Sequence, residues 1–137
     1  MLRCETVCTA FERFSCKDFV GVLALCHPDV QMVDPLRPGV IIRGKEAIRH
    51  HWESRYDQAT MVATIGEHIV ETDDTVIVVV RFRAYDESQR ALVPPFFVAF
   101  RLTFRDDLIV RCEGRIANSV PPKMKALLHL HGDESEV

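Results

Sequence analysis

The hydrophobic positions of this chain have helical spacing in the first part and strand spacing in the second. Residues 5–15 repeat apolar side chains at the i, i+3, i+4 and i+7 spacing of an amphipathic helix: Val7, Ala10, Phe11 and Phe14. A second, shorter helix is predicted from Phe19 to Cys26, where His27-Pro28 would end it. After Gly44, a third helix is predicted from Lys45 to about Tyr56.

From about Met61 the apolar positions recur at every second residue, which is typical of half-buried strands. Four long strands are predicted: Met61–Glu71, Thr75–Asp86, Ala91–Arg105 and Leu108–Ala117. Their short polar connections favour antiparallel pairing. One face of the strands is apolar and the other is mixed and charged, with Val110 expected on the apolar face and Ile109 on the charged face. The sequence therefore predicts an α+β domain, with three N-terminal helices packed on the apolar face of a curved antiparallel sheet.

One carboxylate lies in line with apolar residues just before the third helix. Val30, Met32 and Asp34 share one face of a short extended run. Pro35 and Pro38 then exclude a helix. Because burying an ionised carboxylate alone is costly, we expect Asp34 to be paired, exposed at the strand end, or functional. The structural alternative is an Asp-Pro turn in which the carboxylate caps backbone amides of the loop.

Composition and charge narrow the possible partners. With 137 residues and 47% hydrophobic content, the chain is sized for one domain with one core. We place this domain at residues 1–120 and a tail at residues 121–137. A net charge of −3 provides no basic field for nucleic acid or for an acidic membrane surface. The longest apolar run, residues 75–80, is too short to span a bilayer.

The cysteines and histidines indicate neither a disulfide framework nor a metal site. Five cysteines form an odd set without a C-x-x-C pair. Charged residues interrupt the N-terminal stretch, so no signal-peptide core is visible, and we expect reduced thiols in the cytoplasm. His129 and His131 lie in the tail, where solvated side chains are the default. We therefore expect neither a metal nor a cofactor.

The order of these elements resembles a known family. The helical hairpin, the strand that ends in Val33-Asp34-Pro35, and the helix start Gly44-x-x-Ala47-Ile48-Arg49 resemble the nuclear transport factor 2-like (NTF2-like) superfamily, in its ketosteroid isomerase and SnoaL-like polyketide cyclase branch. The resemblance covers about residues 5–117 and is most specific at residues 25–52. It implies a cystatin-like roll, in which a cone-shaped sheet surrounds a deep apolar pocket and the helices cap its open side.

The resemblance also implies roles for particular residues. In ketosteroid isomerases, the aspartate that matches Asp34 moves a proton, and a Tyr and a protonated Asp form the oxyanion hole. Asp34 is thus a candidate general acid or base, and His51 is a candidate partner on the same side of the third helix, with a half-buried structural histidine as the alternative. Phe14 and Phe100 occupy the two oxyanion positions, and neither can donate a hydrogen bond. This argues against steroid isomerase chemistry.

The predicted pocket residues are apolar, and ordinary core packing is the alternative explanation for them: Phe14, Met32, Trp52, Phe82 and Phe100. The sequence leaves two functions open. One is an enzyme that binds a hydrophobic small molecule and transfers a proton through Asp34, assisted by His51, in a cofactor-independent isomerase, cyclase or dehydratase reaction. The other is a non-catalytic binding or dimerisation module of the same fold.

The outer face of the sheet is the predicted interface between subunits. In this superfamily that face commonly forms a homodimer contact. Here it carries alternating arginines together with the apolar side chains of Val79, Phe97 and Ile109, which suits a homodimer. A solvated surface is the alternative.

Overall fold

Three helices and one sheet make up the described part of the chain. The computed structural model describes residues 2–35, 37 and 39–117. The helices are α1 (Arg3–Ser15), α2 (Phe19–Leu23) and α3 (Lys45–Arg55). The strands are β1 (Cys26–Val33), β2 (Ile41–Arg43), β3 (Thr60–Glu71), β4 (Thr75–Tyr85), β5 (Phe96–Arg105) and β6 (Leu108–Ile116). Within these residues they form one sheet in the order β2-β1-β6-β5-β4-β3, and every neighbouring pair is antiparallel except β1–β6, which is parallel.

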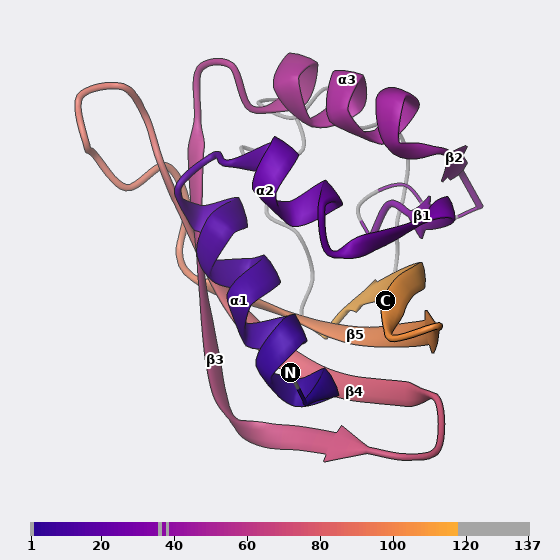
Figure 1. Ribbon diagram of the computed structural model, residues 1–137. Coiled ribbons are helices and arrows are strands. Elements are labelled where there is room, and N and C mark those ends of the chain that lie inside the picture. Colours follow the sequence, from indigo (N-terminus) through magenta and orange to yellow (C-terminus); the bar gives the residue numbers. More distant parts are fainter. Residues whose placement is uncertain (1, 36, 38, 118–137) are drawn as a thin grey trace.

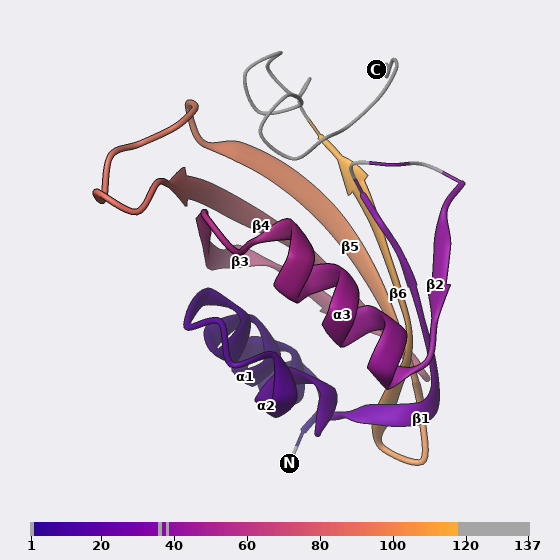
Figure 2. The same cartoon turned by 90° about the horizontal axis from the view of Figure 1, so that it is seen from above.

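The sheet is strongly curved, and the helices lie on its concave side. Figure 1 shows α1, α2 and α3 in front of the sheet, and the view from above in Figure 2 shows the strands bending around them. The predicted apolar faces of two long strands are buried under the helices, as β4 buries every second residue from Val76 to Ala84 and β5 does so from Phe96 to Phe104. The predicted α+β architecture is therefore confirmed, because the period-two pattern separates a core face from a solvent face.

Local sequence signals set the helix boundaries. The side-chain carboxylate of Glu5 accepts a hydrogen bond from the backbone N–H of Leu2, which caps the first turn of α1. Asp18 does the same for α2, because its Oδ1 accepts a hydrogen bond from the N–H of Gly21 at 2.9 Å. Gly44 precedes α3 with φ of +88°, a backbone conformation that side chains other than glycine rarely adopt.

A β-bulge in β6 overturns one part of the predicted alternation. Thr103 pairs with Arg111 and Phe104 pairs with Ile109, so Val110 is an extra residue without a partner on β5. Because of this extra residue, Ile109 faces the core, where it is 3% exposed. The expectation that Ile109 lies on the charged outer face was wrong. A bulge leaves no mark in the hydrophobic pattern of such a short segment.

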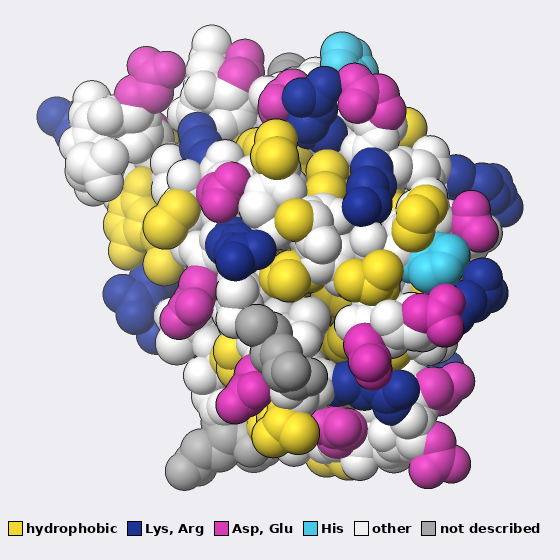
Figure 3. All heavy atoms as spheres, viewed as in Figure 1, with side chains coloured by type: hydrophobic (Ala, Val, Ile, Leu, Met, Phe, Trp, Pro, Cys, Tyr) yellow, Lys and Arg dark blue, Asp and Glu magenta, His cyan; other side chains and the backbone are white. Residues whose placement is uncertain are grey.

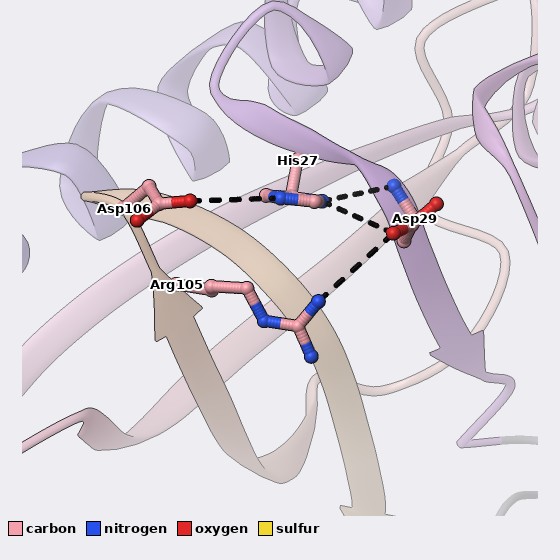
Figure 4. Close-up of polar contacts among 4 residues, drawn as sticks. All are labelled: His27, Asp29, Arg105 and Asp106. Carbon is pink, nitrogen blue, oxygen red and sulfur yellow. Dashed lines mark hydrogen bonds and ion pairs between the residues drawn. The ribbon is translucent and has the colours of Figure 1, made fainter.

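The second helix also ends earlier than predicted, at Leu23, and the His27-Pro28 pair belongs to β1. Polar contacts hold this stretch beside the β5–β6 turn (Figure 4). Nδ1 of His27 accepts a hydrogen bond from the N–H of Asp29 at 3.0 Å, and its Nε2 lies 3.9 Å from the Asp106 carboxylate. Arg105 lies 3.9 Å from Asp29. The apolar spacing would allow the helix to continue to Cys26, but these tertiary contacts hold the stretch from Cys26 in β1 instead.

One strand boundary and one whole strand also differ from the prediction. The strand expected from Ala91 begins at Phe96, because Pro94 and Pro95 have no N–H to donate to a neighbouring strand. Ala91 makes only an isolated bridge to Tyr85. β2 was not predicted, since its three residues are too few to show an alternation. The predicted tail (residues 121–137), with its histidines, lies outside the described residues.

Gly114 in β6 permits a close approach that positions the Asp34 loop. A Cβ atom at this position would lie 2.8 Å from the ring of Phe100 and 2.8 Å from Cβ of Pro35. Both neighbours are rigid rings, so neither could move aside without shifting backbone. The absence of a side chain at Gly114 therefore lets Pro35, and with it Asp34, pack onto the sheet.

We expect Gly114→Ala to destabilise the fold by about 1–3 kcal/mol, the usual cost of overpacking a filled core. Urea denaturation followed by far-UV circular dichroism measures this free energy of unfolding. Gly66→Ala is the matched control, because a Cβ at Gly66 would meet no atom within 4 Å and φ there is not in the left-handed region. Equal stability of Gly114→Ala and the wild type would contradict the packing described above.

Candidate functional site

An apolar cavity of about 100 Å³ lies between the helices and the concave face of the sheet. All three helices and most strands contribute to its wall. The lining side chains are almost entirely hydrophobic: Ala10, Phe11, Phe14, Val22, Leu23, Cys26, Val30, Met32, Pro35, Ile48, Trp52, Tyr56, Met61, Phe82, Phe96, Val98, Phe100, Leu102, Ile109 and Cys112. This volume is smaller than the roughly 300–1,000 Å³ of sites for drug-sized ligands. It is closer to a cavity of about 150 Å³ that takes up benzene.

Aromatic rings from separate elements form much of the cavity wall. The ring of Phe14 on α1 lies 5.4 Å from that of Trp52 and 5.5 Å from that of Tyr56, both in edge-on geometry. Phe11 lies 5.1 Å from Phe100 on β5. Such pairs hold large side chains in defined orientations. The cavity thus has a rigid aromatic wall that joins α1 to α3 and to the sheet.

Few polar atoms belong to the lining, and their acid–base state is clear. Burial raises the pKa of Cys26 to about 11 and that of Cys112 to about 12. Both groups are therefore neutral thiols near pH 7, which are poor nucleophiles. Burial, and to a smaller extent the negative charge of Asp34, raises the pKa of Tyr56 above its usual value. Tyr56 accordingly keeps its proton and is a hydrogen-bond donor.

Asp34 is buried at the end of β1, where its side chain meets α3. The residue is 4% exposed, and its Oδ2 lies 3.2 Å from Nε2 of His51. His51 directly precedes Trp52 and Asp34 directly precedes Pro35, and both Trp52 and Pro35 line the cavity. The contact between Asp34 and His51 therefore lies next to the cavity lining in the chain without being part of it.

Arg55 completes this group, which we call the Asp34 cluster (Asp34, His51 and Arg55). Its Nη2 lies 3.6 Å from the same Oδ2 of Asp34, and its side chain is 7% exposed. A carboxylate buried this deeply needs compensation, which a guanidinium one helical turn after His51 provides. A carboxylate so compensated is better suited to orient a neighbouring imidazole than to remove a proton from carbon.

The structure separates the predicted site residues into two sets. The five predicted pocket residues all line the cavity: Phe14, Met32, Trp52, Phe82 and Phe100. The two predicted catalytic residues, Asp34 and His51, contact each other but are not among the lining residues. Arg55 was missed as part of the site. Its place on the same helix stripe as Ile48 and Trp52 was the available signal.

Other classes of site find no support among the described residues. No group of three or more His, Cys, Asp or Glu side chains there is arranged to hold a metal ion. None of the described helices has the length and apolar character needed to cross a bilayer. On the helix side of the molecule, acidic and basic side chains are interspersed with small hydrophobic groups (Figure 3), so that this face presents no field of a single sign.

Comparisons with known proteins agree with this architecture. The family described as a SnoaL-like domain matches residues 7–112. A candidate polyketide cyclase from Xanthomonas campestris pv. campestris superimposes with a TM-score of 0.71 at 17% identity, covering 82% of this chain and 88% of that one. A protein with a ketosteroid isomerase-like fold from Catenulispora acidiphila, solved with trimethylamine, gives 0.71 at 16% identity, covering 96% and 98%.

A third similar structure also contains a small molecule. TerC co-crystallised with polyporic acid superimposes with a TM-score of 0.67 at 21% identity, covering 83% of this chain and 90% of that one. At these identities the likeness establishes the fold alone. No curated protein matches the sequence.

The ion pair between Asp34 and Arg55 yields a test of stability. We expect Arg55→Met to lower the free energy of unfolding by about 3–5 kcal/mol, because it leaves a buried carboxylate without its guanidinium. The double variant Asp34→Asn/Arg55→Met should recover much of this loss, since the uncompensated charge is gone. Chemical denaturation of the wild type, both single variants and the double variant gives the coupling energy. Additive effects would show that the two side chains are not energetically coupled.

Proposed function

We propose that this chain, which belongs to the SnoaL-like domain family of the NTF2-like fold, binds a hydrophobic small molecule in its cavity and transfers a proton on it without a cofactor. The reaction class is that of an isomerase, cyclase or dehydratase. The observation that carries the proposal is a preformed apolar cavity next to the contact between the buried Asp34 and the partly buried His51. A carboxylate paired with an imidazole beside an apolar cavity is an arrangement found in acid–base sites.

The Asp34 cluster supports a division of roles between its members. In the tautomer in which Nε2 of His51 carries the proton, the Nε2–H group donates a hydrogen bond to Oδ2 of Asp34, and Nδ1 has a free lone pair. Nδ1 then accepts a proton from a carbon of the ligand, and Asp34 stabilises the imidazolium that forms. Returning the proton to a different atom completes an isomerisation. In this scheme Asp34 acts mainly by orienting His51, because Arg55 already compensates its charge.

The alternative is a binding module with no reaction, and specific observations favour it. Phe14 and Phe100, at the positions of the usual oxyanion donors, line the cavity as hydrocarbon surface. Losing one such donor typically costs about 2.7–4 kcal/mol of transition-state stabilisation. Asp34 and His51 are also not among the residues that line the cavity. Binding is thus shared by both candidates, and proton transfer distinguishes them.

Hydrogen exchange into a simple ketone tests the proton transfer directly. In D₂O, a base in the site should accelerate deuteration of the methyl group of acetophenone, a ketone with a single aromatic ring. Proton NMR measures the rate. We expect His51→Gln and Asp34→Asn to lower the protein-dependent rate by about 10²–10⁴-fold, the usual contribution of a general base.

Binding is followed separately through Trp52, the one tryptophan of the chain, which lines the cavity. Its indole ¹H–¹⁵N signal should shift on addition of acetophenone in the wild type and in both variants. A shift without accelerated exchange in the wild type would support the binding module. Absence of any shift would contradict both candidates.

We also propose that the chain forms a homodimer through the outer face of the sheet. Ile77 on β4 and Phe97 on β5 are 41% and 38% exposed there. Arg101 is the strand partner of Ile77, and Arg81 is that of Phe97, while Glu113 offers the opposite charge on β6. A two-fold interface places each residue opposite the same patch of a second copy, so this mixture of apolar and opposite-charged side chains is self-complementary.

The dimer can be tested with one substitution. Light scattering after size exclusion should give twice the chain mass of 15.7 kDa for the wild type. Phe97→Lys removes an apolar contact and adds a like charge beside Arg81, so it should give a monomer. Val20→Lys, an exposed position on α2, is the control and should stay dimeric. A wild-type mass of one chain at micromolar concentration would contradict the proposal.

A further inference from the structure

Positive charge is concentrated on the outer face of the sheet, although the chain as a whole has a net charge of −3. Asp29 and Glu113 form ion pairs on this face, with Arg105 at 3.9 Å and with Arg111 at 3.0 Å. Arginines nevertheless outnumber these two carboxylates. They occupy outward-facing positions of β2, β4, β5 and β6: Arg43, Arg81, Arg83, Arg101, Arg105, Arg111 and Arg115.

Three of these arginines surround one small residue, Ala99 on β5. Arg115 on β6 is the cross-strand partner of Ala99, and Arg101 follows two residues later on the same face of β5. Arg81 on β4 lies diagonally across from Ala99, because it pairs with Phe97. Neighbours of these kinds have Cβ atoms about 5–8 Å apart, within reach of long side chains. The three guanidinium groups can therefore meet above the short side chain of Ala99.

This arginine triad (Arg81, Arg101 and Arg115) makes no ion pair with a carboxylate among the described residues. Glu113 is the strand partner of Arg101, but its carboxylate lies 3.0 Å from Nε of Arg111. Nη1 of Arg111 in turn donates a hydrogen bond to Gln31 at 2.7 Å, which fixes the Arg111 side chain beside Glu113. Like charges on neighbouring strand positions are destabilising. An anion bound to the triad would relieve this repulsion.

We propose that the arginine triad binds a small multivalent oxyanion of the phosphate class, and that this anion neutralises the dimer interface. The inference rests on the proposed homodimer, because a two-fold contact through the outer face brings the triads of both copies into one interface. Guanidinium groups bind phosphate oxygens through two parallel hydrogen bonds. Without an anion, the like charges of the two copies oppose association.

The surroundings of the triad suit a compact anion. Val79 is the cross-strand partner of Ala99 on the side away from Arg115, and the exposed side chains of Ile77 and Phe97 lie close by on the same face. The triad is thus bordered by apolar side chains. A nucleic acid strand would instead require cations spaced along its backbone. A phosphate or pyrophosphate ion presents its whole charge at one point.

The affinity of the dimer in two salts tests the inference. Sedimentation velocity over a dilution series gives the dissociation constant of the dimer in chloride and in millimolar pyrophosphate, at the same pH and ionic strength. Because the anion binds the dimer in preference to the monomer, pyrophosphate should lower this dissociation constant. We expect a decrease of about tenfold, the scale of one hydrogen bond between charged groups.

Two variants remove one guanidinium each from the triad. In Arg101→Gln and in Arg115→Gln, a like charge is lost from the interface, so the dimer in chloride should be at least as tight as that of the wild type. The effect of pyrophosphate should fall to about twofold or less, because one of the anion's charged donors is gone. Arg83→Gln is the matched control, because Arg83 lies on the same face of β4 but beyond Arg81 from Ala99. It should keep the tenfold effect.

The outcomes separate the anion site from the homodimer. Equal dimer affinity of the wild type in both salts would overturn the anion site and leave the homodimer standing. A tenfold effect that persists in Arg101→Gln or Arg115→Gln, or one that is lost equally in Arg83→Gln, would show an adventitious ion only and would also overturn the site. A wild type that stays monomeric in both salts would overturn the homodimer together with this inference. Far-UV circular dichroism verifies that each variant is folded.

Discussion

The buried charge of Asp34 is the constraint that organises this end of the molecule. A carboxylate that is 4% exposed is tolerated only with compensation, and here the compensation comes from α3 through His51 and Arg55. The contact therefore fixes the orientation of α3 relative to the end of β1. The same helix brings Ile48 and Trp52, and its C-terminal cap Tyr56, into the cavity wall. The ion pairs of Asp34 and the shape of the cavity therefore both depend on the position of α3.

Glycines at two positions make this arrangement possible. Gly44 turns the chain from β2 into α3 at a positive φ, and Gly114 leaves room for Pro35 above β6. Neither position contributes a side-chain contact. Gly44 allows α3 to start where its side chains reach Asp34, and Gly114 allows the loop that carries Asp34 to pack against the sheet. The polar cluster is therefore supported by close backbone packing as well as by charge.

Much of the fold and part of the site followed from the sequence. The period-two pattern of β4 and β5 correctly separated Phe82 and Phe100 from the outer residues, because burial of one sheet face is recorded directly in the alternation. It failed at Ile109, where one bulged residue reverses the faces, since a bulge depends on pairing with β5. Arg55 was missed as a partner of Asp34. Its place on the apolar stripe of α3 indicates that it faces the core, but the sequence does not show which distant carboxylate it contacts.

The separation of an apolar cavity from a polar edge limits the chemistry of this site. The lining of aromatic and aliphatic side chains excludes water and strengthens any charge interaction at its boundary. Phe14 and Phe100 line it as hydrocarbon surface, and Tyr56 carries the one hydroxyl group among the described lining side chains. The proton transfer proposed above therefore requires the ligand to reach α3, where His51 contacts Asp34. A ligand that does not reach this contact would fill the cavity without reacting, which is the behaviour expected of the alternative binding module.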